Sequence, residues 1–422
     1  MVKLDSRKLK TTDKSINFAR NDFPILQTQM NGQPLAFLDT AASAQKPACV
    51  IEAMNDIYKN NYSNIHRGLY NISQKLTEEY ETARAKIARF VGAASEKEII
   101  FTRNATESLN LIAQSWGRKY LKKGDEIIIS GMEHHANIVP WQLLQDQIGI
   151  IIKTIPVLED GTLDLEALPN MLSTRTRLVS AVHISNGFGT INNINKITEI
   201  TKEFNPKIKV CIDGSQGIVH TPVHMQNLGT DFYVFTGHKL YGPTGIGVLY
   251  GRYDILETMP PYQGGGDMIE RVSLEEGTTY KEPPYRFEAG TPAIVEVIGL
   301  GKAIDYVQTI GIPAIQNHER KLLEYGTEKL RAINGLKLYG PENPDQKAGI
   351  FSFTMDCAHH SDIGMILDQC GVAIRTGHHC CMPLMHRFSI DGTARASLGL
   401  YSNADDINQL AEGLQKVRKL FA

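Results

Sequence analysis

Long apolar runs, excess charge and cysteine are all scarce in this sequence, and each absence excludes a class of protein. No apolar run approaches the roughly 20 residues that a helix needs to cross a bilayer, so no membrane span is expected. A formal net charge of −2 gives no reason to expect nucleic acid, which binds to clustered basic faces. The N-terminal segment lacks the apolar stretch of a secretory signal, and Asp5 and Asp13 argue against a transit peptide, so a cytosolic location is expected.

The few cysteines are scattered along the chain, as in proteins of a reducing compartment and unlike a disulfide framework. They form no C-x-x-C pair, so a zinc ribbon is not expected. Cys380 and Cys381 alone stand side by side.

The length of 422 residues predicts two domains, because a single hydrophobic core rarely serves so long a chain. In the first part, short β-branched apolar runs alternate with segments that are mostly long enough for helical crossovers. Such a pattern predicts an α/β domain with a mainly parallel, seven-stranded sheet covered on both faces. The last strand follows its predecessor after a short loop, so it is expected to run antiparallel. The expected strands are 98–102, 126–130, 150–157, 177–185, 210–213, 232–236 and 246–251.

A helix is predicted over residues 77–91, with Thr77 as its N-cap and Gly92 as its stop. From about residue 300 the pattern changes to a smaller α+β domain. We expect a large domain over 26–300 and a small one over 301–422, with residues 1–25 packing on the latter. The small domain is predicted to contain helices near 314–333, 361–370 and 404–420 and strands at 336–339, 350–355, 372–376 and 395–401.

Ligands of open α/β sheets bind at the carboxyl ends of the strands, which directs attention to the residues that follow them. Thr106 begins a helix after strand 98–102, where free backbone N–H groups offer a phosphate seat, although a plain N-cap explains it equally well. Asn186, Asp213 and Gln216 follow later strands, and His134 follows strand 126–130. Each of these alone is as readily a turn or cap residue as a functional one.

Lys239 gives a sharper signal, because it lies between the strand 232–236 and a loop rich in Gly and Pro. A lysine that attacks a carbonyl to form a Schiff base needs partial desolvation, and this compact setting provides it. Thr236 and His238 stand beside it, within reach of a phosphate group.

Cys380 gives the second sharp signal. Its neighbours Arg375, His378 and His379 are cationic or can become so, which favours a reactive thiolate. A zinc site is the rival interpretation, but consecutive side chains rarely converge on one tetrahedral ion, so no metal is expected. Arg395 is suited to bind a carboxylate, or else to form an ordinary surface ion pair.

Together these segments resemble the class V aminotransferase family of fold-type I pyridoxal 5′-phosphate (PLP) enzymes. Within it they are most similar to the group II, SufS-type cysteine desulfurases and their selenocysteine-lyase relatives. The resemblance runs from about residue 37 to residue 402. It is carried by the motifs NIHRGLY, MEHHANIVPWQ, DGSQG, TGHKLYGPTGIGVLYG, PYQGGGDMI, FEAGTP and RTGHHCCMPLM.

The resemblance implies roles for single residues. Lys239 carries PLP as a Schiff base, Asp213 keeps the pyridine nitrogen protonated, and His134 stacks on the ring and moves protons. Thr291 of FEAGTP reaches the phosphate of the partner subunit, which implies a homodimer. The remaining residues that it implies for the cofactor are Thr106, Asn186, Gln216, Thr236 and His238.

The implied substrate is L-cysteine, with L-selenocysteine left open. Its carboxylate is held by Arg395 with help from Arg375 and Asn186, and Cys380 accepts the sulfur for iron–sulfur cluster assembly. Two departures stand out: Cys381 replaces the usual Ala after the reactive cysteine, and residues 359–362 read HHSD where one branch has a His-Pro-His-like segment. The second departure favours a SufE-like sulfur acceptor.

Two rival functions stay open on the sequence alone. Another PLP enzyme of the same fold, such as an aminotransferase, needs no nucleophilic cysteine, and Cys380 argues against it. An inert scaffold or metal-binding protein is disfavoured by the presence of both Lys239 and Asp213.

Overall fold

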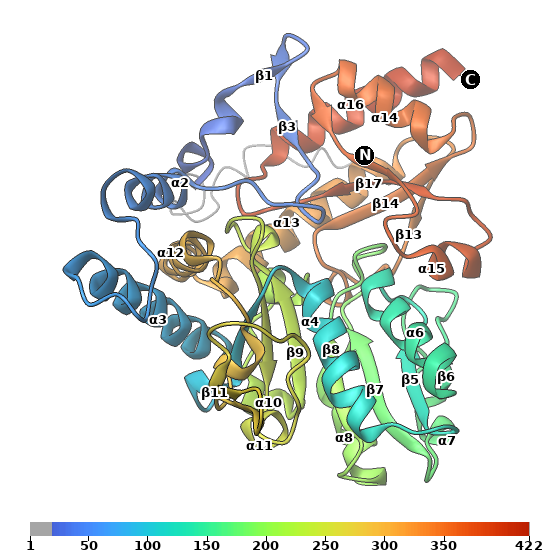
Figure 1. The fold of residues 1–422 in the computed structure, drawn as a ribbon. Coiled ribbons are helices and arrows are strands. Elements are labelled where there is room, and N and C mark those ends of the chain that lie inside the picture. The colour runs from blue at the N-terminus through green and yellow to red at the C-terminus, as the bar shows by residue number, and fades with distance from the viewer. Residues whose placement is uncertain (1–18, 422) are drawn as a thin grey trace.

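The computed structural model describes residues 19–421, so the expectation for residues 1–18 lies outside the described part. A large α/β region with one wide sheet carries a smaller region, orange to red in Figure 1, at one end of that sheet. Among residues 19–421, no helix is long and apolar enough to cross a membrane.

The large sheet has seven strands in the order β4-β10-β9-β8-β7-β5-β6. Strands β9, β8, β7, β5 and β6 are parallel, and β10 is antiparallel to both its neighbours, as predicted. In chain order the strands are β4 (Ile99–Thr102), β5 (Glu126–Ser130), β6 (Ile151–Ile155), β7 (Thr176–Val182), β8 (Lys209–Asp213), β9 (Phe232–Thr236) and β10 (Gly247–Gly251).

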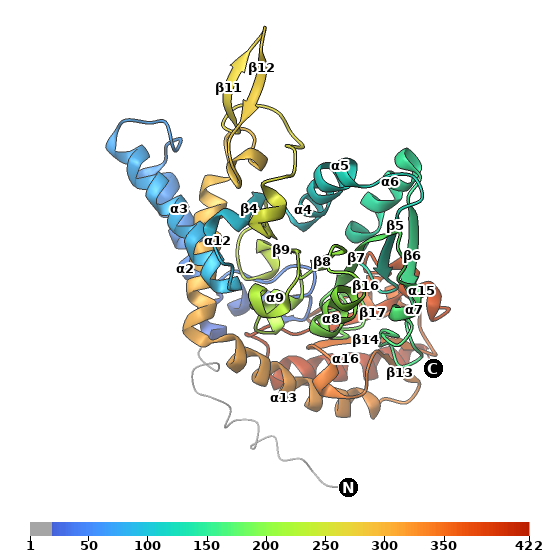
Figure 2. The same cartoon turned by 90° about the horizontal axis from the view of Figure 1, so that it is seen from below.

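Both faces of this sheet are buried because successive side chains of a strand point to opposite sides. In β9, Phe232 and Val234 join the core on one face, whereas Tyr233 and Phe235 join the core on the other. Helices cover both faces (Figure 2). The helices of this region are α2 (Ala48–Asp56), α3 (Asn71–Val91), α4 (Ala105–Ile112), α5 (Arg118–Tyr120), α6 (Val139–Ile148), α7 (Leu168–Met171), α8 (Ile194–Phe204), α9 (Gly217–His220), α10 (Met225–Leu228), α11 (Tyr253–Leu256) and α12 (Ile294–Ile310).

The smaller region is built on a four-stranded sheet in the order β13-β14-β17-β16, with its own hydrophobic core. The predicted fold class, a mainly parallel α/β domain with a smaller α+β domain, is confirmed. The elements of the smaller region are α13 (Ile312–Arg331), β13 (Leu336–Tyr339), β14 (Ile350–Met355), α14 (His360–Gln369), β15 (Val372–Ala373), β16 (Arg375–Gly377), α15 (Met382–Arg387), β17 (Thr393–Ser397) and α16 (Ala404–Phe421).

Segments before the large sheet also contact the smaller region. Strand β3 (Ala36–Phe37) pairs in parallel with β15, and both Ala36 and Leu38 lie in the core of the smaller region. Arg20 donates to the Asp406 carboxylate at 2.8 Å. The short strands β1 (Gln29–Met30) and β2 (Gln33–Pro34) form a separate pair, and the exact domain boundaries stay a prediction.

A β-hairpin projects from the body of the large region (Figure 2). It consists of β11 (Ile269–Ser273) and β12 (Gly277–Tyr280), and Leu274 at its turn is fully exposed.

Several predicted elements were wrong in extent. Strands β6, β7 and β17 end at Ile155, Val182 and Ser397, before the predicted ends at 157, 185 and 401. Helix α3 begins at Asn71, and Thr77 is an interior residue whose hydroxyl donates to the Ser73 carbonyl at 2.7 Å instead of capping the helix. The predicted strand 372–376 breaks into β15 and β16, which join different sheets. One apolar run cannot reveal that its two halves pair with different partners.

Candidate active site

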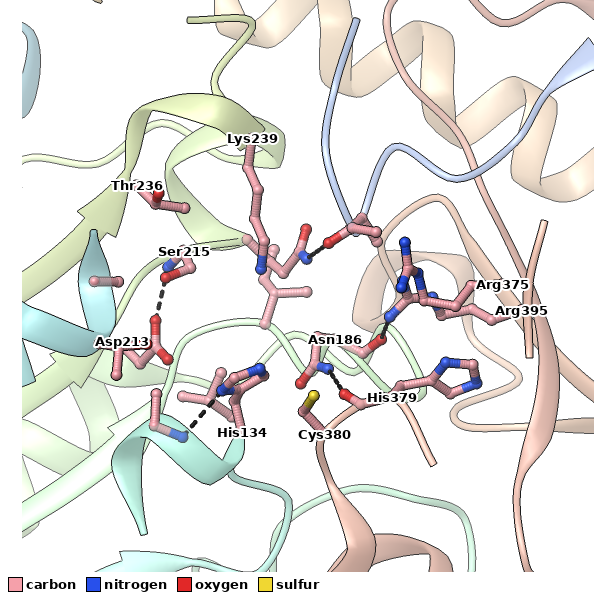
Figure 3. A pocket seen from close by; sticks show the side chains of 18 of the residues that line it. His134, Asn186, Asp213, Ser215, Thr236, Lys239, Arg375, His379, Cys380 and Arg395 are labelled. Atoms are coloured by element: carbon pink, nitrogen blue, oxygen red, sulfur yellow. Dashed lines mark hydrogen bonds between the residues drawn. The ribbon is translucent and has the colours of Figure 1, made fainter. Parts of the chain in front are cut away.

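A cavity of about 420 Å³ lies where the carboxyl ends of the parallel strands meet the smaller region. Figure 3 shows the side chains that point into it from both parts of the molecule. Of the residues predicted to form the site, all except Thr291 line this cavity: Thr106, His134, Asn186, Asp213, Gln216, Thr236, His238, Lys239, Arg375, Cys380 and Arg395.

Lys239 enters the cavity from a single 3₁₀ turn, Gly237–Lys239, directly after β9. Burial lowers the pKa of its amine from 10.5 to about 8, although the nearby carboxylate of Asp213 opposes the shift. At pH 7.5 roughly a quarter of such an amine is neutral, against about a thousandth at the ordinary pKa. The neutral amine is the form that can attack a carbonyl.

Asp213 ends β8 and is 4% exposed, with one carboxylate oxygen accepting the Ser215 N–H at 3.0 Å. Glycine is required at the next position, since a Cβ on Gly214 would lie 1.9 Å from the Tyr233 ring. The tight turn leaves the other carboxylate oxygen of Asp213 free to face the cavity (Figure 3).

His134 precedes a 3₁₀ turn, and its Nδ1 accepts the Ala136 N–H at 3.0 Å, which places the ring proton on Nε2. Burial, followed by the charge of Lys239, lowers the pKa of His134 to about 4. Burial and Lys239 likewise lower the pKa of His238 to about 4. Both rings are therefore neutral at physiological pH, and His134 offers a flat, uncharged face and an N–H donor.

The part of the cavity near α4 is suited to a phosphate. Thr106 lies in the first turn of α4, where backbone N–H groups are free and the helix dipole favours an anion. Thr236 ends β9, and its buried hydroxyl has no hydrogen-bond partner among residues 19–421.

An arginine pair forms the opposite wall (Figure 3). Arg395 is 2% exposed and donates to the Asn186 carbonyl at 2.7 Å, and its Nε is without a partner in the described chain. Asp39 lies between the two guanidinium groups, 2.9 Å from Arg375 Nη2 and 3.5 Å from Arg395 Nη2. One carboxylate cannot neutralise two cations, so this wall retains positive charge.

Cys380 is exposed, and Figure 3 shows its sulfur pointing into the cavity. The loop that carries it is not extended, because His379 and Cys380 both lie in the left-handed region with φ of 51° and 57°. Such residues cost of order 1–3 kcal/mol each, so the surroundings must hold them. Asn186 Nδ2 donates to the His379 carbonyl at 2.6 Å, and the Cys380 N–H donates to His378 Nδ1 at 3.1 Å.

Cys381 points the other way, into the hydrophobic core of the large region. Its thiol contacts the His378 carbonyl at 3.1 Å, and burial raises its pKa to about 12. Of the two adjacent cysteines, only Cys380 therefore faces the cavity. Among the described residues, no group of three or more His, Cys, Asp or Glu could hold a metal ion.

Thr291 lies elsewhere. It is exposed and lines a separate cavity of about 280 Å³ together with Gly245, Tyr262 and Gln263. Within one chain, Thr291 therefore has no place in the main cavity.

Comparison with known proteins places the chain in a family. Residues 36–410 match the family described as Aminotransferase class-V. The chain belongs to this family. Its cofactor is PLP, as predicted. The unpartnered Thr236 hydroxyl, the low-pKa amine of Lys239 and the acid Asp213 fit a phosphate, an aldehyde and a pyridine nitrogen, respectively.

Class-V relatives named cysteine desulfurase are similar over nearly the whole chain. One from Serratia proteamaculans is 49% identical over 405 residues, covering 96% of this chain and 98% of the relative. One from Dickeya dadantii is also 49% identical, covering 96% of this chain and 97% of its own length.

Solved class-V structures agree. The cysteine desulfurase CsdA from Escherichia coli matches with a TM-score of 0.88 at 36% identity, covering 96% of this chain and 98% of its own. An apo cysteine desulfurase from Thermococcus onnurineus matches with a TM-score of 0.90 at 36% identity, covering 95% and 97%. The resemblance drawn from the sequence is therefore confirmed.

Two residues of this class-V site were missed by the sequence reasoning. Asp39, which bridges the arginine pair, lies in the motif FLDTAASAQKP, and the acid directly after its apolar run was the available signal. Glu133 is 1% exposed behind His134, and burial raises its pKa to about 8. Nothing in the letters of MEHHAN shows that its glutamate is buried.

Proposed function

We propose that the protein is a PLP-dependent cysteine desulfurase that converts L-cysteine to L-alanine and takes the sulfur onto Cys380. The observation that carries the proposal is that Lys239 and Cys380, from different parts of the fold, face one cavity together with an arginine pair (Figure 3). An aminotransferase needs the lysine and the arginines but has no use for the cysteine.

Lys239 holds PLP as a Schiff base, and the bound cofactor supplies an electron sink for negative charge at the substrate Cα. The Asp213 carboxylate would accept a hydrogen bond from the pyridine nitrogen and keep it protonated, and His134 would cover one face of the ring. Asn186 and Gln216 contact the ring side. The phosphate is bound by Thr106, Thr236 and His238.

Arg395 and Arg375 bind the substrate carboxylate, and the amide of Asn186 lies close by. Because Arg395 is almost fully buried, its interaction with an anion is screened less than a surface pair would be. This fixes the substrate with its sulfur toward Cys380. The Lys239 amine would remove the Cα proton of the bound substrate, and His134 would assist.

The Cys380 thiolate attacks the substrate sulfur, a new S–S bond forms and the Cβ–S bond breaks. The electron pair of the broken bond passes to the carbon fragment, which takes up protons and leaves as alanine. Cys380 then carries a persulfide, so the sulfur has been transferred without an external oxidant. A thiol or an acceptor protein removes it.

Replacing Asp213 by Asn should leave the fold intact and lower alanine formation by roughly a hundredfold or more, because a neutral amide cannot hold the pyridinium proton. Asp254→Asn, on the surface beside Arg252, is the matched control. Steady-state alanine release with matched PLP content checks this. Near-normal turnover of Asp213→Asn would show that the ring lies elsewhere.

A homodimer completes the site in this proposal, with Thr291 reaching the phosphate of the partner's PLP. Two observations support this: Thr291 is exposed, and it does not line the main cavity of its own chain. Large apolar side chains are exposed as well, at Leu69 (92%) and Tyr70 (55%). Such surface favours association with a second subunit.

Mixing two inactive variants, Lys239→Ala and Thr291→Asp, should restore activity after subunit exchange. A mixed dimer has one site with both native residues, so about one quarter of wild-type turnover is expected at equal mixing. Native mass spectrometry confirms the exchange. If mixed dimers form and turnover does not recover, the two subunits do not share sites.

The finer assignment follows from the resemblance. The sulfur feeds iron–sulfur cluster assembly through a SufE-like acceptor, in a cytosolic protein, and L-selenocysteine serves as a second substrate. Ser361, with an exposed side chain, stands in the HHSD segment at the start of α14, where the His-Pro-His-like segment of the other branch would lie.

Incubation of the PLP-loaded protein with L-cysteine tests the proposal directly. Without reductant, about one alanine per active site is expected, because the persulfide blocks Cys380. With a thiol reductant, turnover should continue, and sulfide and alanine should form in equal amounts. Pyruvate or an amino-acceptor requirement would instead indicate a lyase or an aminotransferase.

A further inference from the structure

Hydrogen bonds of Glu133 and Asn137 hold the segment after β5 against the large sheet. Glu133 accepts the Val182 N–H at 2.6 Å on one carboxylate oxygen and the Asn137 amide at 2.7 Å on the other. Asn137 is oriented in turn, because its oxygen accepts the Trp141 indole N–H at 3.0 Å and the Ser180 hydroxyl at 2.8 Å. These hydrogen bonds fix the position of the segment between Glu133 and Asn137.

His135 belongs to this segment and contacts the loop that carries Cys380. Its backbone N–H donates to the Cys380 carbonyl at 2.8 Å, and its Nε2 accepts the Met382 N–H at 3.1 Å. These two bonds hold the loop on either side of Cys381. His378 stands against the same ring, with centroids 5.6 Å apart.

We propose that His135 is a positioning residue that fastens the strained loop 378–382 to the large region, so that the Cys380 sulfur faces the cavity. This rests on the function proposed above. His135 touches neither cofactor nor substrate, since it is absent from the cavity lining that includes His134. His134 therefore faces the cavity, whereas His135 holds the loop.

The loop needs such a contact because two successive non-glycine residues, His379 and Cys380, are held in the left-handed region. A peptide N–H can only donate, so the ring of His135 must keep a lone pair on Nε2 and carry its proton on Nδ1. Burial, followed by the neighbouring His378, lowers the pKa of His135 and favours this neutral form.

Two substitutions separate the ring's role from mere bulk. His135→Ala removes the acceptor, whereas His135→Gln places an amide oxygen close to the position of Nε2. We expect His135→Ala to lower kcat for alanine formation roughly tenfold with KM for L-cysteine nearly unchanged, and His135→Gln to recover most of the loss. PLP absorbance should be unchanged in both. His386→Ala, an exposed histidine of α15, is the control.

Hydrogen–deuterium exchange of the peptide covering 378–385, measured on the PLP-bound protein without cysteine, reads the contact independently of turnover. The Met382 amide should exchange roughly tenfold faster in His135→Ala, and at the wild-type rate in His135→Gln and in the control. Equal exchange in His135→Ala and wild type, or equal impairment of the Ala and Gln variants, overturns the inference. Absence of alanine from the wild type would instead overturn the proposed function and leave the exchange result standing.

Discussion

Replacement of Lys239 by alanine is expected to abolish covalent attachment of PLP and all measurable turnover. Among residues 19–421 no other lysine lines the main cavity, and Lys239 enters it on a fixed turn after β9 with a pKa lowered to about 8. Borohydride reduction of the wild type, followed by peptide mapping, should place the pyridoxyl group on Lys239.

The same treatment of Lys239→Ala should give no labelled peptide, although PLP can still bind through its phosphate and ring contacts. Lys416→Ala, an exposed lysine of α16, should be labelled and active like the wild type. A pyridoxyl group on any other residue would mean that the cavity has been misread, whatever reaction the protein catalyses.

The second large effect concerns the adjacent cysteines. Cys380→Ser should bind PLP and L-cysteine normally and lose desulfuration almost completely, because a hydroxyl does not attack the substrate sulfur at a useful rate. Cys381→Ala should be nearly silent in turnover, since the Cys381 thiol lies in the core with a pKa raised to about 12. Alanine release by each variant is the measurement.

Cys381→Ala also removes a buried sulfur, so its thermal stability is expected to fall slightly, by an amount typical of a small cavity. That change should leave kcat per folded, PLP-loaded protein within about twofold of wild type. An inactive Cys381→Ala together with an active Cys380→Ser would reverse the assignment and contradict the orientation of the loop.

The large sheet could be predicted well because its strands are short, apolar and buried on both faces, a pattern that survives in the sequence alone. Strand β9 has the predicted bounds, and the short loop after it correctly predicted an antiparallel β10. The run 372–376 was not read correctly, because its division between two sheets depends on tertiary partners.

It could also be predicted that the site residues lie close together, since residues that follow parallel strands meet at one edge of the sheet. Cys380 and Cys381 point in opposite directions, as adjacent residues of an extended segment would. The cause is different here, because His379 and Cys380 lie in the left-handed region and make a turn. Asp39 was missed as a site residue because its role comes from contact with Arg375, hundreds of residues away along the chain. No role was predicted for His135 for the same reason, since its ring contacts the distant Met382.

Transfer of sulfur from L-cysteine to Cys380 can be followed in a single-turnover experiment with L-cysteine that carries a heavy sulfur isotope. The PLP-loaded protein is mixed with the labelled substrate without reductant, alkylated and digested, and the peptide containing Cys380 and Cys381 is fragmented by mass spectrometry. We expect one heavy sulfur atom on Cys380, none on Cys381, and an equal amount of alanine. Alanine formation with no heavy sulfur on Cys380 would contradict this expectation.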